Sequence, residues 1–264
     1  MQILRYRWEN FEPFFILGNG KNRGRMRLLF QDISLRFGEK WCIGFFKNGK
    51  YNTCPNNRKT GYENMCEDCQ KEDDFFPCIK CSGSACINLK RREECKENNY
   101  YIYLAAFDSL LKVGVSYEHR LLERLVEQGA DFGAKIALVR DGKNARLLEQ
   151  QMKLFLGARD RIRGKEKHAT LFGNPNMAVA TIYKAINKLK NNFNLLEPEI
   201  YDLRRHYKLQ NVSADPNLLE IKDNLEIIGR MVAAKGNILI FKNQNGFFSL
   251  DANYLIGRDA EKIN

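Results

Sequence analysis

The chain has 264 residues, and 43 lysines and arginines outweigh 32 aspartates and glutamates, for a formal net charge of +11. It has no apolar run of about eighteen residues, and arginines and acids interrupt its start. We therefore expect a cytoplasmic protein with no membrane span and no signal peptide. The positive charge favours a polyanionic partner, although a lysine- and asparagine-rich composition can also make a protein basic without one.

Both ends of the chain carry β signals. In residues 1–50, short apolar or alternating runs, the last of them residues 41–46, are separated by turn residues such as Asn48-Gly49. Residues 218–264 contain three more such runs, with a hairpin turn at Asn245-Gly246. We expect these two β segments to form one barrel or sandwich, with a central domain inserted between them.

All eight cysteines fall between Cys42 and Cys95, and residues 51–98 form a cysteine-rich segment that is too polar to pack a core. Two Cys-x-x-Cys pairs in a cytoplasmic chain favour thiolate metal ligation over disulfides. Two sets of four predict two structural zinc ions. In sequential order the first set is Cys42, Cys54, Cys66 and Cys69, and the second is Cys78, Cys81, Cys86 and Cys95.

Other arrangements of these cysteines remain open. Ligands of the two sets could interleave, and an iron-sulfur cluster or a redox disulfide is an alternative to zinc. Some cysteines could instead be buried apolar side chains, and Cys42 beside Trp41 and Ile43 is the main candidate.

Residues 99–160 have the pattern of a ββαβα domain. Residues 100–106 and 110–115 predict a hairpin, and residues 135–140 predict a third strand. A helix capped by Ser116 and ended by Gly129 lies between them, and a second helix covers residues 145–156.

Two short motifs in this hairpin, one in each strand, resemble those of a known domain family. Residues 101–103 (YIY) and 112–114 (KVG) are similar to the paired strand motifs of the GIY-YIG nuclease domain. Tyr101 stands in place of that family's first glycine and Lys112 in place of its second tyrosine. More narrowly, residues 112–116, 124–130 and 145–149 resemble a family of unknown function, DUF2797, over most of the chain. That likeness also supports the first cysteine set as one site.

The resemblance implies a site for metal-assisted phosphodiester hydrolysis. Arg124 on the first helix would stabilise the phosphate, with Arg120 as a rival, and Tyr103 would deprotonate or orient water. Lys112 would anchor phosphate. Glu149 would bind Mg²⁺ or another divalent cation. Each residue also has a structural reading: Tyr103 as core, Glu149 as a solvated acid, and Arg124 in a salt bridge with Glu127 or Asp131.

Residues 161–217 predict a basic helical region, with helices at residues 177–193 and from Glu197 to Tyr207. Dense cations between residues 153 and 168 form either a phosphate-contacting strip or a solvated loop. The candidate nucleic-acid-binding residues are Arg120, Arg146, Arg159, Arg161, Arg163 and Lys165.

Together these patterns predict an α+β protein with a GIY-YIG-like domain between β segments and a zinc-binding subdomain. The predicted function is binding of RNA or DNA, with Mg²⁺-dependent endonuclease activity as one possibility. The alternative is a non-catalytic RNA- or DNA-binding module, or a tRNA-modification factor that retains the fold. Nothing in the sequence indicates an oligomeric state.

Overall fold

The computed structural model describes residues 1–20 and 22–263, and it shows a mixed α+β protein with large sheets and several helices. The chain divides into two compact units. Unit 1 comprises Met1–Phe76 and Lys208–Asn264, and unit 2 comprises Pro77–Tyr207. Residues 51–76 therefore belong with the two terminal segments, and residues 77–98 belong with the central one. In the part of the chain that is described, no helix is long and apolar enough to span a membrane.

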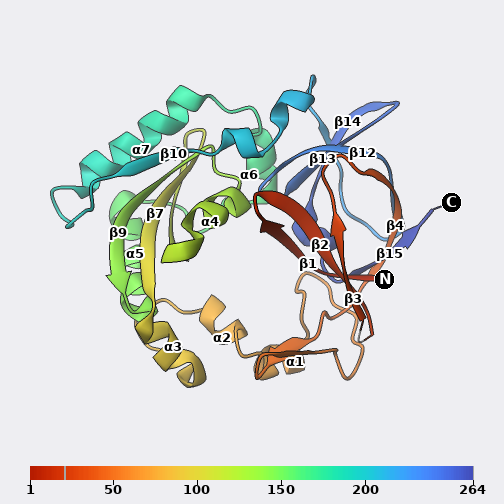
Figure 1. The fold of residues 1–264 in the computed structure, drawn as a ribbon, viewed down its shortest axis with the longest axis horizontal. Helices are drawn as coiled ribbons and strands as arrows, with labels where there is room; N and C mark the ends of the chain where they lie inside the picture. The colour runs from red at the N-terminus through yellow and green to blue at the C-terminus, as the bar shows by residue number, and fades with distance from the viewer. Residues whose placement is uncertain (21, 264) are drawn as a thin grey trace. The chain divides into compact units, whose positions relative to one another are not determined.

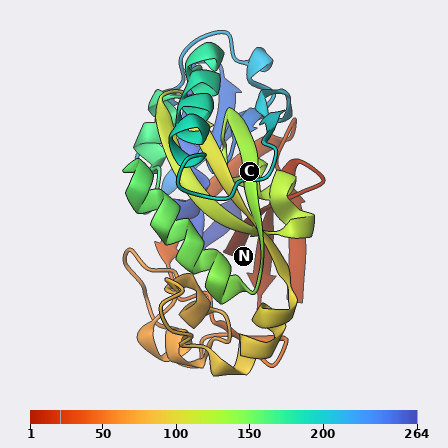
Figure 2. The ribbon, with the colours of Figure 1, turned by 90° about the vertical axis from the view of Figure 1, so that its left-hand side faces the viewer.

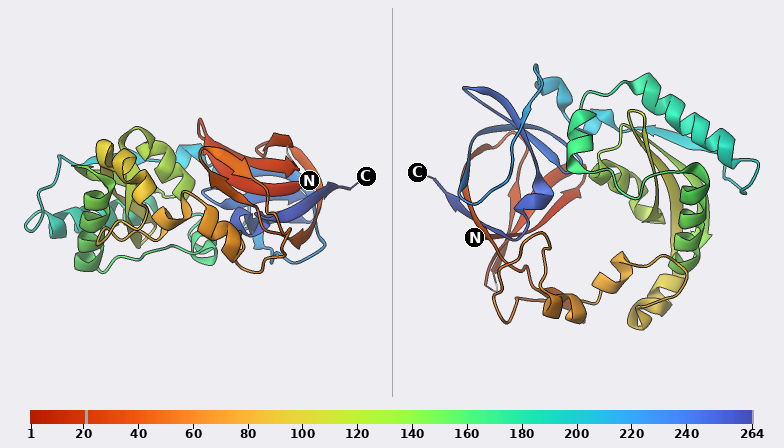
Figure 3. Two further views of the ribbon diagram at one scale, coloured as in Figure 1. Left: turned by 90° about the horizontal axis from the view of Figure 1, so that it is seen from below. Right: turned by 180° about the vertical axis from the view of Figure 1, so that it is seen from behind.

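One large sheet in unit 1 is built from strands of both chain ends. Its strands are β1 (Gln2–Glu9), β2 (Glu12–Asn19), β3 (Asn22–Arg27), β4 (Asp32–Lys40), β11 (Asn217–Leu218), β12 (Leu225–Lys235), β13 (Ile238–Asn243), β14 (Gly246–Asp251) and β15 (Arg258–Lys262). Their order is β11-β14-β13-β12-β4-β15-β1-β2-β3. Figure 3 shows the red N-terminal and blue C-terminal strands side by side. The indole Nε1 of Trp8 donates to the Gly236 carbonyl at 2.9 Å, which ties β1 to the turn between β12 and β13.

A small hairpin and a short helix follow β4 in the N-terminal part of unit 1. The hairpin pairs β5 (Phe45–Lys47) with β6 (Lys50–Asn52), and α1 (Glu67–Glu72) follows. The strand predicted for residues 41–46 begins later than expected, at Phe45, and Trp41 makes an isolated bridge with Lys59. Two short 3-10 helices, η4 (Leu209–Asn211) and η5 (Ala252–Leu255), lie in the C-terminal part of this unit.

Unit 2 is built on a four-stranded antiparallel sheet in the order β10-β9-β7-β8. Its elements are β7 (Asn99–Phe107), β8 (Leu110–Tyr117), β9 (Phe132–Arg140), β10 (Glu199–Asp202), α3 (Arg92–Glu97), α4 (Leu121–Gln128), α5 (Gly142–Leu156), α6 (Gly164–Ala169), α7 (Pro175–Leu189), η1 (Leu89–Arg91), η2 (Glu118–Arg120) and η3 (Arg204–His206). Helix α2 (Phe76–Ile79) spans the boundary between the two units.

Helices cover both faces of this sheet. Alternate residues of β7, such as Ile102 and Leu104, join α5 and α7 in one apolar core, and Figure 2 shows these helices in front of the sheet. The α4 helix packs against the opposite face, as Figure 1 shows. There Leu125 lies so close to Gly133 that a Cβ on Gly133 would be 2.6 Å from the Leu125 side chain. Tyr103 points to this second face, since it lies one residue from Ile102 in the strand.

Two sequence predictions in unit 2 are wrong. Ser116 lies in β8 and does not cap the following helix, because the strand continues to Tyr117 and the η2 turn intervenes before α4. The helix predicted from Glu197 to Tyr207 is instead β10 followed by η3. Residues 199–202 pair antiparallel with Phe132–Lys135 of β9, and this pairing overrides the local helical signal. The basic helical region of residues 161–217 is therefore only partly helical.

Candidate functional site

Four cysteines of unit 1 come together in a group that could hold a metal ion. The Sγ atoms of Cys42, Cys54, Cys66 and Cys69 all lie within 4.8 Å of one another. The Sγ atoms of Cys54 and Cys66 are 3.8 Å apart. Four Zn–S bonds of about 2.3 Å in a tetrahedron place sulfur atoms roughly 3.8 Å apart, so this spacing fits a zinc site.

Short loops and one helix start place these sulfurs. Cys66 is the N-cap of α1 and Cys69 lies in its first turn, which brings both sulfurs of the Cys-x-x-Cys pair to one side. Cys42 follows the large sheet, and its chain turns sharply at Gly44, where φ is +76°. A Cβ at Gly44 would lie 2.1 Å from the Asn52 carbonyl oxygen, so only glycine fits against the hairpin there.

Backbone N–H groups point at these sulfurs, as expected for thiolates that ligate a metal. The Cys66 amide donates to Cys42 Sγ at 3.2 Å. Burial alone raises the pKa of Cys54, but hydrogen bonds from the amides of Arg58 and Asn56 bring the pKa down to about 7. Burial raises the pKa of Cys42, and it also raises the pKa of Cys69. Charge on these two sulfurs therefore requires a bound cation.

The four cysteines of the second predicted set do not come together as those of the first set do. Cys78 lies in α2, where its sulfur accepts from Asn88 Nδ2 at 3.1 Å, and Cys95 lies in α3 beside Gly142 and Tyr100. Within residues 1–20 and 22–263, Cys78, Cys81, Cys86 and Cys95 do not gather into a metal-holding group of three or more. The second zinc ion remains a prediction from the sequence.

The predicted hydrolytic residues are brought together in unit 2. Tyr103 is 1% exposed, and its ring covers Gly114, the residue paired with it across the hairpin. Arg124 hydrogen-bonds the Tyr103 hydroxyl, and the charges of both Arg124 and Glu149 act on that hydroxyl. Burial is the main influence and raises the pKa of Tyr103, so the phenol is protonated at neutral pH.

Lys112 is the most perturbed cation of this group. Burial, followed by repulsion from Arg124, lowers the pKa of Lys112 to about 8, with smaller contributions from Arg146 and Arg161. The Glu149 carboxylate acts in the opposite direction. Lys112 Nζ donates to Gln128 Oε1 at 2.8 Å, which fixes the ammonium against α4. Three arginines therefore act on the Lys112 ammonium.

Helix α4 holds its arginines through one buried acid. Glu127 accepts from Arg120 at 3.0 Å and from Arg124 at 3.3 Å, and its side chain is only 9% exposed. Arg120 also pairs with Glu123 at 3.1 Å. The salt bridge between Arg124 and Glu127 was the structural alternative for this arginine, and it coexists with the hydrogen bond to Tyr103. Sequence reasoning missed Gln128, although its position four residues after Arg124 places it on the same helix face.

Helix α5 supplies the carboxylate. Glu149 is buried, and its Oε2 accepts from Arg146 Nη1 at 3.0 Å one turn earlier in the helix. Asp141 caps this helix by accepting from the Lys143 amide at 2.9 Å, and both of its oxygens bind Arg92. Sequence reasoning read Asp141 only as a turn residue.

The strip of cations after α5 lies on the surface. Arg159 makes an isolated bridge with Lys112 and an ion pair with Glu166. The exposed cations of this strip are Arg159, Arg161, Arg163 and Lys165. Of these, Arg161 is close enough to influence Lys112.

Comparison with known proteins adds one finding. A family model described as Protein of unknown function (DUF2797) matches residues 31–252, which is most of the chain. No curated protein and no solved structure matches it. The matched range includes all four cysteines of the cluster, and it also includes Tyr103, Lys112, Arg124 and Glu149. The chain therefore belongs to the DUF2797 family.

Proposed function

We propose that unit 2 binds the phosphate groups of RNA or DNA at the site formed by Lys112, Arg124 and Arg146. The observation that carries this proposal is the gathering of three arginines around the half-buried Lys112 ammonium, which is held against α4 by Gln128. Burial and the repulsion from these arginines lower the pKa of Lys112. An anionic phosphate entering beside Lys112 would relieve that repulsion and accept charge-assisted hydrogen bonds. The exposed strip at residues 159–165 would extend the contact along the strand, in a sequence-independent way.

Tyr103 then acts as a positioning residue. It is almost fully buried and protonated, so it is poorly suited to take a proton from water. Its hydroxyl instead accepts from Arg124 and holds that guanidinium beside Lys112. The ion pair with Glu127 fixes Arg124 from the other side.

Mg²⁺-dependent hydrolysis of the bound strand is the second candidate. It is favoured by the presence of the Glu149 carboxylate next to Arg124 and Tyr103, the combination that the GIY-YIG-like motifs imply. Glu149 would hold the divalent cation, which would supply charge stabilisation at the phosphate. The ion pair with Arg146 competes for the same carboxylate, so binding without hydrolysis is the better supported function.

In unit 1, we propose a structural zinc ion at the first cysteine set. Four sulfurs that lie within 4.8 Å of one another can fill every ligand position of a zinc ion, which leaves no open position for a reaction. The zinc would hold the β5–β6 hairpin and α1 against the large sheet.

Fluorescence anisotropy with labelled RNA and DNA hairpins at low salt tests the binding proposal. We expect wild type to bind, and Lys112→Met and Arg124→Met to bind several-fold more weakly. Lys262→Met, which removes an exposed lysine of β15, serves as the control. Absence of wild-type binding at low salt would contradict the proposal. Adding Mg²⁺ to the same complexes tests the second candidate: hydrolysis requires cleavage by wild type and its loss in Glu149→Gln with binding retained.

A further inference from the structure

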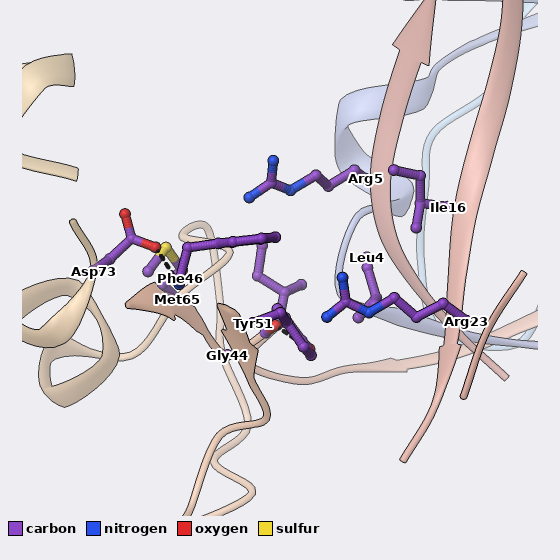
Figure 4. Close-up of a pocket in the computed structure, with 10 residues that line it drawn as sticks. Leu4, Arg5, Ile16, Arg23, Gly44, Phe46, Tyr51, Met65 and Asp73 are labelled. Atoms are coloured by element: carbon purple, nitrogen blue, oxygen red, sulfur yellow. Dashed lines mark hydrogen bonds between the residues drawn. The ribbon is translucent and has the colours of Figure 1, made fainter. Parts of the chain in front are cut away.

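Unit 1 contains a charged hollow that the proposed functions do not use. It has a volume of about 60 Å³ and lies between the large sheet and the β5–β6 hairpin. Figure 4 shows the side chains of Arg5 from β1 and Arg23 from β3 extending toward Phe46 and Tyr51 of the hairpin. Two strands that are not neighbours in the sheet therefore bring two cations to one small space.

Both guanidinium groups are held by aromatic rings. The Cζ atom of Arg5 lies 4.3 Å from the centroid of Phe46, and that of Arg23 lies 3.6 Å from the centroid of Tyr51. Stacking uses the face of a guanidinium and leaves its in-plane N–H donors available. Tyr51 is itself fixed, because its hydroxyl donates to the Ile43 carbonyl at 2.5 Å.

These donors have no protein acceptor. Within the described residues, neither Arg5 nor Arg23 makes an ion pair or a hydrogen bond, and both guanidinium groups lie over aromatic rings. Most other arginines of unit 1 are paired, for example Arg25 with Glu9 and Arg36 with Glu226. Arg5 is half-buried and Arg23 is exposed, so water satisfies these donors, and an anion can replace that water with charge-assisted hydrogen bonds.

The one acid that lines the hollow is already engaged. Asp73 Oδ2 accepts from the Phe46 amide at 2.7 Å, and Oδ1 accepts from the amides of Phe75 and Phe76 at 2.9 and 2.8 Å. Asp73 therefore acts on Arg5 only as a nearby charge. Burial, then Arg7, lowers the pKa of Arg5, and Arg23 lowers it further. Among the residues that line the hollow, the two arginines outnumber this one acid.

We propose that this hollow binds a single phosphate group, with the in-plane N–H donors of Arg5 and Arg23 directed at its oxygens. A hollow of this size beside two guanidinium groups has room for one tetrahedral oxyanion. The phosphate can be free in solution or can belong to the end of a nucleic-acid strand, and the chemistry of recognition is the same. This inference is independent of the site in unit 2.

A different role for the two arginines must be separated from this one. A zinc ion with four thiolates carries a net charge of −2, and Cys42 and Cys69 are close enough to influence Tyr51 in the same hollow. If Arg5 and Arg23 serve only to balance that charge, their removal would weaken metal retention and would have no effect on phosphate.

Isothermal titration of the full-length, metal-loaded chain with inorganic phosphate at constant ionic strength distinguishes these roles. We expect saturable binding by wild type and a loss of about tenfold or more in Arg5→Met and in Arg23→Met, because each removes a charge-assisted donor pair. Methionine keeps an apolar stem over the ring. The matched control is Arg25→Met, which removes a ring-stacked, ion-paired arginine of β3 that does not line the hollow.

Zinc content is measured on the same samples. Unchanged zinc with lost phosphate binding supports the proposal, and lost zinc with unchanged phosphate binding overturns it. Absence of phosphate binding by wild type, or equal binding by Arg23→Met and wild type, also overturns it. Competition by an oligonucleotide with a 5′-phosphate, compared with its 5′-hydroxyl form, identifies the source. Stronger competition by the phosphorylated form supports a strand end, and no competition by either form supports free phosphate.

Discussion

The ring of Tyr103 lies directly over Gly114, its partner across the β7–β8 hairpin. A Cβ on Gly114 would lie 2.4 Å from both Cζ and the hydroxyl oxygen of Tyr103. Glycine at this position therefore allows the tyrosine to lie flat on the hairpin and present its hydroxyl to Arg124. Gly114→Ala should displace the ring and cost about 1–3 kcal/mol of unfolding free energy, together with several-fold weaker nucleic-acid binding.

Chemical denaturation and anisotropy check this prediction. Gly24→Ala is the control, because a Cβ at that strand position has no neighbour within 4 Å. Equal stability and affinity in Gly114→Ala and wild type would show that the ring is not held in this way.

Nucleic-acid affinity should fall as pH rises through about 8. The folded-state pKa of Lys112 is about 8, so this lysine loses its positive charge between pH 7 and pH 9, where an ordinary lysine remains charged. Lys112→Arg should remove the pH dependence while keeping affinity, and Lys112→Met should remove the dependence and weaken binding at pH 7. A parallel loss of affinity in all three proteins would place the titrating group elsewhere.

The same lowered pKa affects stability in the opposite direction. Because the unfolded state binds the proton more tightly than the folded state, the buried ammonium destabilises the fold below pH 8. The free energy of unfolding of wild type should therefore increase, relative to Lys112→Met, as pH is raised from about 8 toward 10.5. Urea titrations of both proteins across this range measure the difference.

Purified protein should carry one tightly held zinc ion at the first cysteine set. Cys54→Ser should lose that ion and destabilise unit 1, because the remaining thiolates cannot complete the tetrahedron. Cys81→Ser, from the set that is not gathered, should retain it. Native mass spectrometry gives the stoichiometry directly. Zinc retained in Cys54→Ser, but lost from Cys81→Ser, would reverse the assignment.

Asp141 should stabilise unit 2 through two contacts, the cap of α5 and the ion pair with Arg92. Asp141→Ala should lower the unfolding free energy by about 1–2 kcal/mol, whereas Asp141→Asn should keep the cap and tolerate the φ of +78°. The hydrogen bond from Arg92 lowers the pKa of Asp141, so this stabilisation is present above the ordinary carboxyl pKa and is lost as pH falls below it. Thermal unfolding at pH 7 and pH 3 compares the three proteins.

Local signals predicted much of unit 2. The β7–β8 hairpin and the α5 helix follow from apolar periodicity and turn residues, and Gly129 ends α4 in the left-handed conformation that a C-terminal glycine adopts. The Cys-x-x-Cys spacing likewise indicated the pair at Cys66 and Cys69. These features depend on residues that are close together in the chain.

Long-range pairing accounts for what the sequence did not reveal. The local sequence around residues 199–202 favours a helix, but the backbone of this segment pairs with β9, more than sixty residues away in the chain. Arg5 and Arg23 reach one hollow only because the sheet and the β5–β6 hairpin bring them there. The sequence indicated Glu127 as a possible partner of Arg124, but it did not indicate that this carboxylate is buried or that it also pairs with Arg120.

The central claim is that Lys112 and Arg124 contact phosphate in a bound nucleic acid, and the salt dependence of binding tests it most directly. The logarithm of the association constant is measured against the logarithm of salt concentration for wild type, Lys112→Met, Arg124→Met and the control Lys262→Met. We predict a slope that is shallower by about one in each of the two site variants and unchanged in the control. Identical slopes and affinities in all four proteins would contradict the account.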